Sequence, residues 1–224
     1  MEWYWILIIS LSSVLLLFLL TWLLYKPVFK RFWDIVLSFI GILVLSPILL
    51  IFSIAGAIAM RGNPFFTQER PGKNEKIFKL VKFRSMNNKK DKDGNLLPDE
   101  KRLSGYGKFI RKTSIDELPE LFNIFVGHMS IVGPRPLLVR YLPRYNEEQH
   151  HRHDVRPGLT GYAQCHGRNL LTWEEKFKMD VFYVNHYSLF LDISILFKTL
   201  TAVFKHSGIN SGTSATMEEF FGDE

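Results

Sequence analysis

The sequence predicts a helix-rich α+β protein that is anchored in a membrane and carries a compact domain on the cytoplasmic side. Two long segments near the N-terminus, residues 3–25 and 35–60, contain no charged side chain. Residues 61–210 hold 25 basic and 16 acidic side chains, a net charge of +9. Within this region, a stretch rich in β-branched and aromatic residues precedes several helical patterns. The composition excludes a disordered chain, a disulfide-rich secreted module and a simple soluble domain.

The first apolar segment is expected to form a transmembrane helix within residues 1–25. Its charge-free part, Trp3–Tyr25, has 23 residues, and at about 1.5 Å per residue it is long enough for a bilayer core of roughly 30 Å. Lys26, Lys30 and Arg31 follow this segment, and no basic residue precedes it. Because positive charges stay in the cytoplasm, we expect the N-terminus outside and Lys26 inside. The flanks do not match those of a cleaved signal peptide.

The second apolar segment, within residues 26–60, is expected to enter the membrane and return on the same side. A straight span over Ile35–Met60 would carry the basic domain outside and leave Lys/Arg-rich flanks at both ends. Ser46 and Pro47 lie at its middle. Proline removes a backbone donor and favours a bend, and the serine hydroxyl can satisfy the freed backbone groups. The alternative is a second ordinary span with a proline kink.

The rest of the chain divides into a domain at residues 61–210 and an acidic tail at residues 211–224. Residues 63–84 alternate apolar stretches with a Pro-Gly turn, which indicates a short β-hairpin. Pro119 places the start of a helix near Asp116, because proline is tolerated only in the first turn. Further helical patterns cover residues 137–153, 173–187 and 189–204. The last of these is apolar enough to be either core or a helix at the membrane interface.

Several common reactive motifs do not occur in the sequence. Neither GxGxxG nor GxxxxGK followed by Ser or Thr is present, which argues against the dinucleotide and NTP-driven enzymes that use these loops. Cys165 is the single cysteine, so an internal disulfide and a paired-cysteine zinc site are excluded. The run of residues 150–153, His-His-Arg-His, favours a solvated face over a metal site, because adjacent histidines point apart and Arg152 repels a cation.

The adjacent carboxylates Asp116 and Glu117 are the strongest candidates for chemistry. Near a helix N-terminus, the helix dipole stabilises their ionised forms. Arg111 precedes them, and Arg135 follows within Gly-Pro-Arg-Pro. A structural alternative is a capping box formed by Ser114 and Glu117. Capping accounts for those two residues but leaves Asp116 and the arginines without a role.

Four ordered motifs resemble a known family: residues 82–86 (KFRSM), 111–119 (RKTSIDELP), 132–136 (VGPRP) and 156–161 (RPGLTG). Together they are similar to the bacterial sugar transferase family, the monotopic polyprenyl-phosphate phosphoglycosyl transferases, over about residues 27–210. The small form of that family has a re-entrant helix broken at a Ser-Pro pair and a compact catalytic domain. Ser46 and Pro47 match that pair, so the resemblance supports re-entry.

Within the family, the chain looks most like the PglC type, which transfers N,N'-diacetylbacillosamine 1-phosphate to undecaprenyl phosphate. This likeness rests on four short stretches, residues 137–139 (LLV), 145–149 (YNEEQ), 167–169 (GRN) and 176–177 (KF). The N-terminal segment Trp3–Tyr25 is a departure, because the minimal PglC-like form lacks it.

The resemblance implies a two-step transfer of a sugar 1-phosphate from a UDP-sugar to undecaprenyl phosphate, which initiates assembly of a glycoconjugate or polysaccharide. Asp116 would attack the sugar-bearing phosphate, expel UMP and form a covalent intermediate that the lipid phosphate then displaces. Glu117 would be the magnesium or proton-handling partner, so Asp116 and Glu117 are also the expected Mg²⁺ ligands. The expected phosphate and substrate contacts are Lys82, Arg111, Arg135 and Arg168.

The implied partners are UDP-sugar, undecaprenyl phosphate and membrane lipids at the cytoplasmic face of the bacterial inner membrane. The basic domain suits anionic substrates and an anionic membrane surface alike. Its Lys and Arg residues are scattered, and no aromatic stacking platform accompanies them, so we expect no nucleic acid partner. A homo-oligomer and glycosyltransferases of the same pathway remain open as partners. The alternative to an enzyme is a non-catalytic scaffold or anion-binding protein of a polysaccharide complex.

Overall fold

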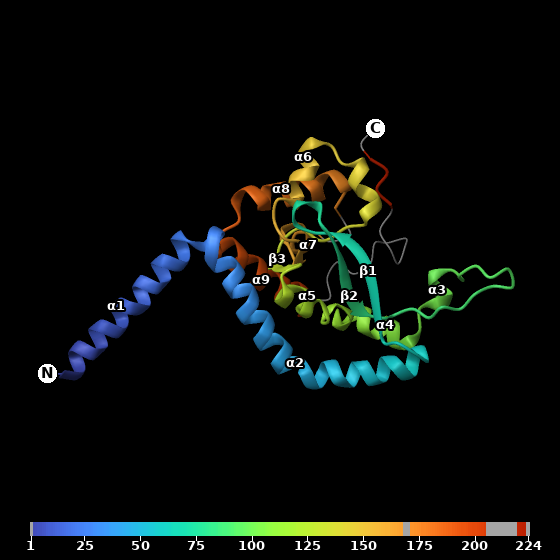
Figure 1. The fold of residues 1–224 in the computed structure, drawn as a ribbon, viewed down its shortest axis with the longest axis horizontal. Coiled ribbons are helices and arrows are strands. Elements are labelled where there is room, and N and C mark those ends of the chain that lie inside the picture. Colours follow the sequence, from blue (N-terminus) through green and yellow to red (C-terminus); the bar gives the residue numbers. More distant parts are fainter. Residues whose placement is uncertain (1, 168–170, 205–218, 223–224) are drawn as a thin grey trace.

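The computed structural model describes residues 2–167, 171–204 and 219–222, and it confirms a helix-rich fold with few strands. Figure 1 shows two long N-terminal helices, α1 and α2, and a compact body built from the rest of the chain. The α1 helix (Glu2–Leu23) projects away from the body, whereas α2 (Lys30–Met60) runs along it. A π-helical turn at Tyr25–Phe29 joins them.

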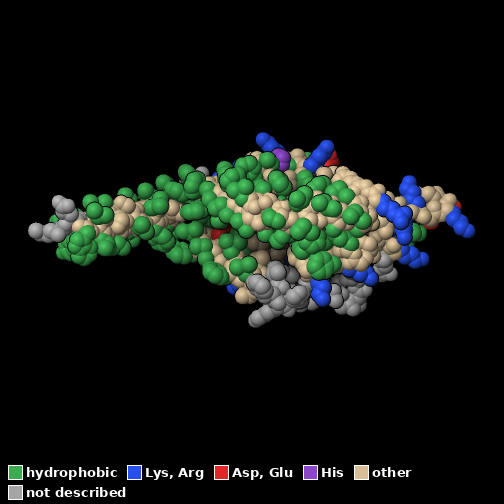
Figure 2. Space-filling view, turned by 90° about the horizontal axis from the view of Figure 1, so that it is seen from below, with side chains coloured by type: hydrophobic (Ala, Val, Ile, Leu, Met, Phe, Trp, Pro, Cys, Tyr) green, Lys and Arg blue, Asp and Glu red, His purple; other side chains and the backbone are tan. Residues whose placement is uncertain are grey.

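Both N-terminal helices are long and apolar enough to cross a membrane, judged by length and composition alone. Only 6% of the apolar window in α1 and 11% of that in α2 is buried against the protein. Most of their large hydrophobic side chains are therefore exposed. Figure 2 shows these side chains along α1 and across the face of the body seen from below. Such an extended apolar surface is typical of contact with lipid.

The α2 helix is bent rather than interrupted. It is helical from Lys30 to Met60 with Pro47 inside it, and Figure 1 shows a change of direction about halfway along its length. Pro47 has no N–H to donate to the carbonyl of Leu43, four residues earlier. The Ser46 hydroxyl donates to that same carbonyl at 2.7 Å. The prediction that Ser46 satisfies a backbone group freed by Pro47 is thus confirmed.

The predicted hairpin is present as β1 (Phe65–Pro71) and β2 (Ile77–Phe83), paired antiparallel from Phe65 opposite Phe83 to Pro71 opposite Ile77. The next helices are α3 (Asp99–Arg102), α4 (Gly105–Lys112) and α5 (Glu120–Val126). Buried side chains of β2 and α5 form one core cluster. The buried Asn123 amide also donates to the Lys79 carbonyl at 2.8 Å and accepts from Val81 N–H at 3.0 Å. These bonds fix α5 beside β2.

Two helix predictions were wrong in their extent. The helix expected to start near Asp116 begins at Glu120, with Pro119 as its N-cap, and a 3-10 turn at Ile115–Glu117 precedes it. The pattern over residues 137–153 is divided into a 3-10 segment at Val139–Arg144, α6 (Glu147–His150) and a 3-10 turn at His151–His153. Pro143 lies inside the first piece, and a capping box at Asn146 starts a new helix there.

The C-terminal half of the body confirms the other two predicted helices, α8 (Trp173–His186) and α9 (Leu189–Phe204). Between them and α5 lie the parallel strands β3 (Ser130–Val132) and β4 (Gly158–Thr160) and the short α7 (Tyr162–Cys165). The α9 helix takes part in the core, as predicted, because Ile195 is 1% exposed, whereas Phe197 on another face is 66% exposed. One face of α9 therefore packs inward, and the other presents apolar side chains.

Candidate active site

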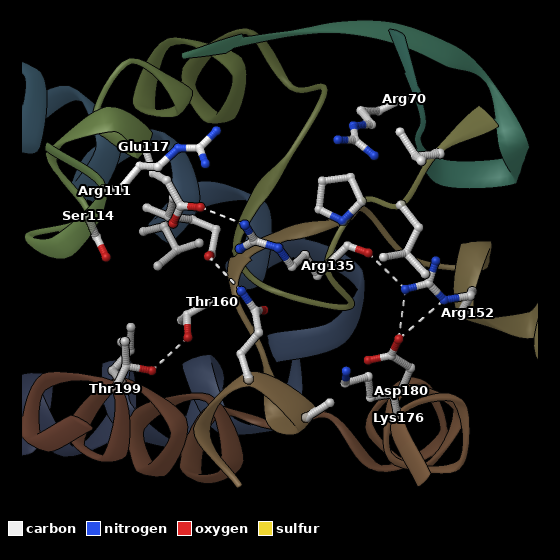
Figure 3. Close-up of a pocket in the computed structure, with 18 of the residues that line it drawn as sticks. Arg70, Arg111, Ser114, Glu117, Arg135, Arg152, Thr160, Lys176, Asp180 and Thr199 are labelled. Atoms are coloured by element: carbon white, nitrogen blue, oxygen red, sulfur yellow. Dashed lines mark hydrogen bonds and ion pairs between the residues drawn. The ribbon is translucent and has the colours of Figure 1, made fainter. Parts of the chain in front are cut away.

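A cavity of about 770 Å³ lies in the body between the hairpin, the turn that precedes α5, and helices α7 to α9. Its wall is partly apolar, and its polar lining is dominated by positive charge. Figure 3 shows the labelled side chains of Glu117, Arg135, Arg152 and Asp180 arranged around it. Among the residues that the structure describes, five basic ones line the cavity: Arg70, Arg111, Arg135, Arg152 and Lys176. Two acidic residues, Glu117 and Asp180, also line it. The net positive charge suits an anionic ligand.

Glu117 is the centre of an ion-pair network. Its Oε1 lies 3.0 Å from Lys82 Nζ and 2.6 Å from Arg135 Nη2. Burial alone would raise the pKa of Glu117, but the charges of Arg135 and Lys82 hold it well below its usual range. The capping-box alternative is wrong, because Ser114 makes no side-chain cap and adopts a left-handed conformation with φ of 54°. Glu117 is therefore an ionised anchor for two cations.

Lys82 also bridges to a second carboxylate, which the sequence patterns did not single out. Lys82 Nζ lies 2.9 Å from Glu120 Oε1, at the first residue of α5. The Glu120 side chain is 4% exposed, and burial together with the charge of Glu117 raises its pKa to about 7, against the opposing effect of Lys82. Lys82 thus shares its charge between two carboxylates, and one of them can change protonation near neutral pH.

Asp116 differs from Glu117, although the two are adjacent. In the described part of the chain, no hydrogen bond or ion pair holds its carboxylate, and it is not among the residues that line the cavity. Burial and the charge of Glu117 raise the pKa of Asp116 to about 6, although Lys82, Arg111 and Arg135 oppose the shift. This is the reverse of the expectation from the helix dipole, because the turn at Ile115–Glu117 lies before α5 rather than in its first turn.

Arg111 and Arg168 are the other two predicted substrate contacts, and Arg111 lies near the Asp116–Glu117 pair, called the dyad from here on. Arg111 lines the cavity, and its Nε donates to the Ser85 hydroxyl at 2.9 Å. With Lys82 and Arg135, it is one of the cations whose charges act on Asp116. Arg168 lies outside the described residues. The structure therefore brings five of the six predicted site residues together around the turn that precedes α5.

Arg152 lines the cavity, although the sequence pattern predicted that it would face solvent. The prediction of a solvated face for residues 150–153 fails at Arg152 and His153, which are 3% and 5% exposed. Arg152 Nη2 pairs with Asp180 at 2.7 Å and donates to the Arg135 carbonyl at 2.8 Å. Arg152 therefore links α8 to the segment that carries Arg135. Its partner is 28 residues away in sequence, so no local pattern could have revealed the pair.

The dyad has the donor chemistry that Mg²⁺ prefers. Among the described residues, no group of three His, Cys, Asp or Glu side chains could hold a metal by itself. Mg²⁺ is commonly bound by one or two carboxylates together with substrate phosphates and water. The unpaired carboxylate of Asp116 and the neighbouring Glu117 supply such oxygens. Asp116 and Glu117 therefore fit a Mg²⁺ ion that is shared with a phosphorylated substrate.

Comparison with known proteins identifies relatives for most of the chain. A model of the family described as bacterial sugar transferase matches residues 25–206. The uncharacterized sugar transferase EpsL of Bacillus subtilis is 48% identical over 196 residues, which are 87% of this chain and 96% of that protein. The galactosyl transferase CpsE of Streptococcus agalactiae is 42% identical over 193 residues, 80% of this chain and 43% of that protein.

A further relative carries a reaction in its name. The UDP-glucose:undecaprenyl-phosphate glucose-1-phosphate transferase of Klebsiella pneumoniae is 38% identical over 183 residues, which cover 77% of this chain. The chain spans about two fifths of the length of CpsE and of the Klebsiella protein, whereas it spans nearly all of EpsL. The range matched by the family model, residues 25–206, includes the turn, the hairpin and the described residues that line the cavity.

Proposed function

The chain belongs to the bacterial sugar transferase family, and from this membership we propose that it transfers a sugar 1-phosphate from a UDP-sugar to undecaprenyl phosphate. The Klebsiella relative is named for this reaction. The observation that carries the proposal is the cluster around the turn before α5. There, an unpaired carboxylate, Asp116, lies beside Glu117, which is paired with Lys82 and Arg135.

Asp116 is the proposed nucleophile. Its carboxylate attacks the sugar-bearing phosphorus of the UDP-sugar, the bond from that phosphorus to the UMP oxygen breaks, and UMP leaves with the electron pair. A phosphate oxygen of undecaprenyl phosphate then attacks the same phosphorus, and the bond to Asp116 breaks. The products are UMP and a polyprenyl diphosphosugar, and the Asp116 carboxylate is restored. Within the described residues, no ion pair of the Asp116 carboxylate competes with this bond.

The surrounding charges have separate roles in this scheme. Arg111 and Arg135 bind phosphate oxygens and stabilise charge that develops during transfer. Glu117 holds Arg135 and Lys82 in place through its ion pairs at 2.6 and 3.0 Å. When bound, Mg²⁺ would neutralise the diphosphate, with Asp116 and Glu117 as its protein ligands. Arg168 is proposed as a further substrate contact.

The membrane arrangement is proposed to be one span by α1 and a re-entrant α2, with the body on the cytoplasmic face. Both halves of α2 contact the same body. Near its start, Asp34 accepts from Ile131 N–H at 2.9 Å. Beyond the bend, the Phe52 carbonyl accepts from the Tyr106 hydroxyl at 3.0 Å. A straight span would separate the two ends of α2 by the bilayer, so these contacts support re-entry.

Topology can be tested by labelling single cysteines with a membrane-impermeant reagent in a Cys165→Ser background. Cysteines at Gly62 and Asn87 should react only from the cytoplasmic side. Gly62 is suited to this test, because a side chain there meets no atom within 4 Å. A cysteine at Trp3 is the control for the outer side. External labelling at Gly62 would refute re-entry.

Release of UMP from UDP-sugar, on membranes containing undecaprenyl phosphate, tests the reaction. Asp116→Asn should abolish release because the amide is not a nucleophile, and Glu117→Gln should reduce it strongly. Wild-type rates in both variants would show that the dyad mechanism is wrong. Binding of substrates without any turnover would favour the scaffold alternative. A panel of UDP-sugars is needed, because the named relatives act on galactose and glucose, whereas the PglC likeness predicts diacetylbacillosamine.

A further inference from the structure

The cavity contains an unusual concentration of buried polar atoms without hydrogen-bond partners. The described part of the chain has five such side-chain atoms, and three of them belong to residues that line this cavity. They are Arg70 Nε, Trp173 Nε1 and Gln164 Oε1. Buried donors and acceptors are nearly always satisfied in folded proteins, by protein atoms, water or a ligand. Their gathering at one cavity marks polar groups that a ligand bound there can satisfy.

Arg70 forms no ion pair within the described part of the chain, although the charge of Glu120 acts on it. Among the same residues, its one hydrogen bond runs from Nη2 to the neutral Gln68 Oε1 at 2.7 Å. By contrast, Arg135 has Glu117 at 2.6 Å and Arg152 has Asp180 at 2.7 Å. Burial and the charge of Arg135 lower the pKa of Arg70 to about 10, which still leaves it charged at neutral pH. A half-buried guanidinium with a free Nε is suited to bind an anion.

Trp173 presents a donor from a fixed ring. It is the first residue of α8, and its ring stacks on Phe177 with centroids 5.7 Å apart. The Tyr141 ring, which also lines the cavity, meets it edge-on at 5.7 Å. These contacts hold the indole in one orientation, with its buried N–H unpaired. The indole N–H can only donate, so its ligand partner must be an acceptor such as a carbonyl or hydroxyl oxygen.

Arg70 lies beyond Arg135 as seen from Glu117, and Trp173 lines the same cavity beside Tyr141. Figure 3 shows Arg70 and Glu117 on opposite sides of Arg135. Tyr141 lies close enough to Arg70 to influence the pKa of its guanidinium, and the ring of Tyr141 contacts Trp173. A ligand phosphate near Asp116 would therefore have Arg135 beside it and Arg70 beyond. A diphosphate has a second phosphate one bridging oxygen away, followed in UDP-sugar by ribose and a base with carbonyl oxygens.

We propose that Arg70 and Trp173 form a nucleoside monophosphate subsite in this cavity. Arg70 binds the phosphate that leaves as part of UMP, and the Trp173 indole N–H donates to an oxygen of the uridine. The inference rests on the proposed function and deepens it by separating the nucleotide end of the cavity from the end where the sugar phosphate is transferred. Lipid phosphate is the other source of the same chemistry at Arg70, but it offers nothing equivalent to uridine for Trp173.

The test is titration calorimetry on the full chain in lipid nanodiscs, with UMP and inorganic phosphate as probes. Arg70→Met should weaken UMP binding roughly 10- to 100-fold and should also weaken phosphate binding, because charge-assisted hydrogen bonds are lost. Trp173→Phe, which keeps the stacked ring, should weaken UMP binding by about 3- to 10-fold and leave phosphate binding unchanged. Arg140→Met is the matched control, since Arg140 pairs with Glu219 and does not line the cavity.

Unchanged UMP affinity in folded Arg70→Met and Trp173→Phe would overturn the proposal. A higher KM for undecaprenyl phosphate with unchanged UMP affinity would also overturn it, because Arg70 would then serve the lipid acceptor. If Arg70→Met does not fold, Arg70→Lys and Trp173→Phe carry the test, with Arg70→Lys expected to lose less affinity. Failure of the proposed function would look different. In that case the wild-type protein would bind UMP and the variants would bind it more weakly, but no UDP-sugar would release UMP.

Discussion

The protonation of Asp116 gives a quantitative prediction for the first half-reaction. Its pKa of about 6, raised by burial and by the charge of Glu117, means that the reactive carboxylate is lost as the pH falls through 6. The ionised fraction is about 91% at pH 7, about 50% at pH 6 and about 9% at pH 5. We therefore expect the rate of covalent transfer to fall about tenfold between pH 7 and pH 5.

The assay is rapid-quench measurement of the UMP burst with UDP-sugar and without lipid. Omitting undecaprenyl phosphate removes its phosphate ionisation near pH 6 from the profile. Glu120→Gln is the control for the other nearby titration, since burial and Glu117 raise the pKa of Glu120 to about 7. The decrease of the UMP burst rate with a midpoint near pH 6 should persist in that variant.

Removing the charge of Glu117 should shift the midpoint of this pH profile. Glu117→Gln deletes the anion that raises the pKa of Asp116 and frees Lys82 and Arg135, whose charges lower it. The midpoint of the residual UMP burst should therefore shift below pH 6. A burst that is independent of pH between 5 and 7, or a midpoint that does not move in Glu117→Gln, would refute the assignment of Asp116 as the titrating nucleophile.

Three further predictions concern stability and shape. Arg152→Met should lower the free energy of unfolding by about 3–5 kcal/mol, because it leaves the Asp180 carboxylate, only 7% exposed, without its partner. Chemical unfolding of the double variant with Asp180→Leu should show a smaller loss. An equal or greater loss would contradict this account. Ile124→Ala, at a fully buried core position, should cost about 2–5 kcal/mol in the same measurement, whereas a cost below about 1 kcal/mol would mean that the core there refills. Pro47→Ala restores the donor for Leu43 and should straighten α2, so that the Gly62 cysteine loses its exclusively cytoplasmic labelling; unchanged labelling would assign the bend to another cause.

The two long apolar helices and the Asp116–Glu117 pair were accessible from the sequence for different reasons. An uncharged run longer than a bilayer is a property of composition, so it needs no tertiary information to be recognised. The dyad was recognised because Asp116 and Glu117 are adjacent and lie within a family motif. The hairpin was equally local, since the short turn after Pro71 joins two strands that pair with each other.

The environment of the dyad could not be read locally. The sequence pointed to a helix dipole that stabilises both carboxylates, but α5 starts at Glu120 and Asp116 has a raised pKa instead. Glu117 meets Lys82, 35 residues earlier, and Arg135, 18 residues later. These distant cations form ion pairs with Glu117, which lowers its pKa, whereas burial and the charge of Glu117 raise the pKa of Asp116.

Two apolar N-terminal segments, a basic body and an Asp-Glu pair within the motifs of a sugar transferase can all be recognised in the sequence. Charge, length and short-range spacing are enough to fix these features. Three other relations appear only in the folded chain. Among the described residues, Glu117 is paired while Asp116 is not, Arg152 is buried against Asp180, and Arg70 and Trp173 line one cavity. These relations join residues far apart in the chain, and their energies depend on burial, which exists only after the elements pack together.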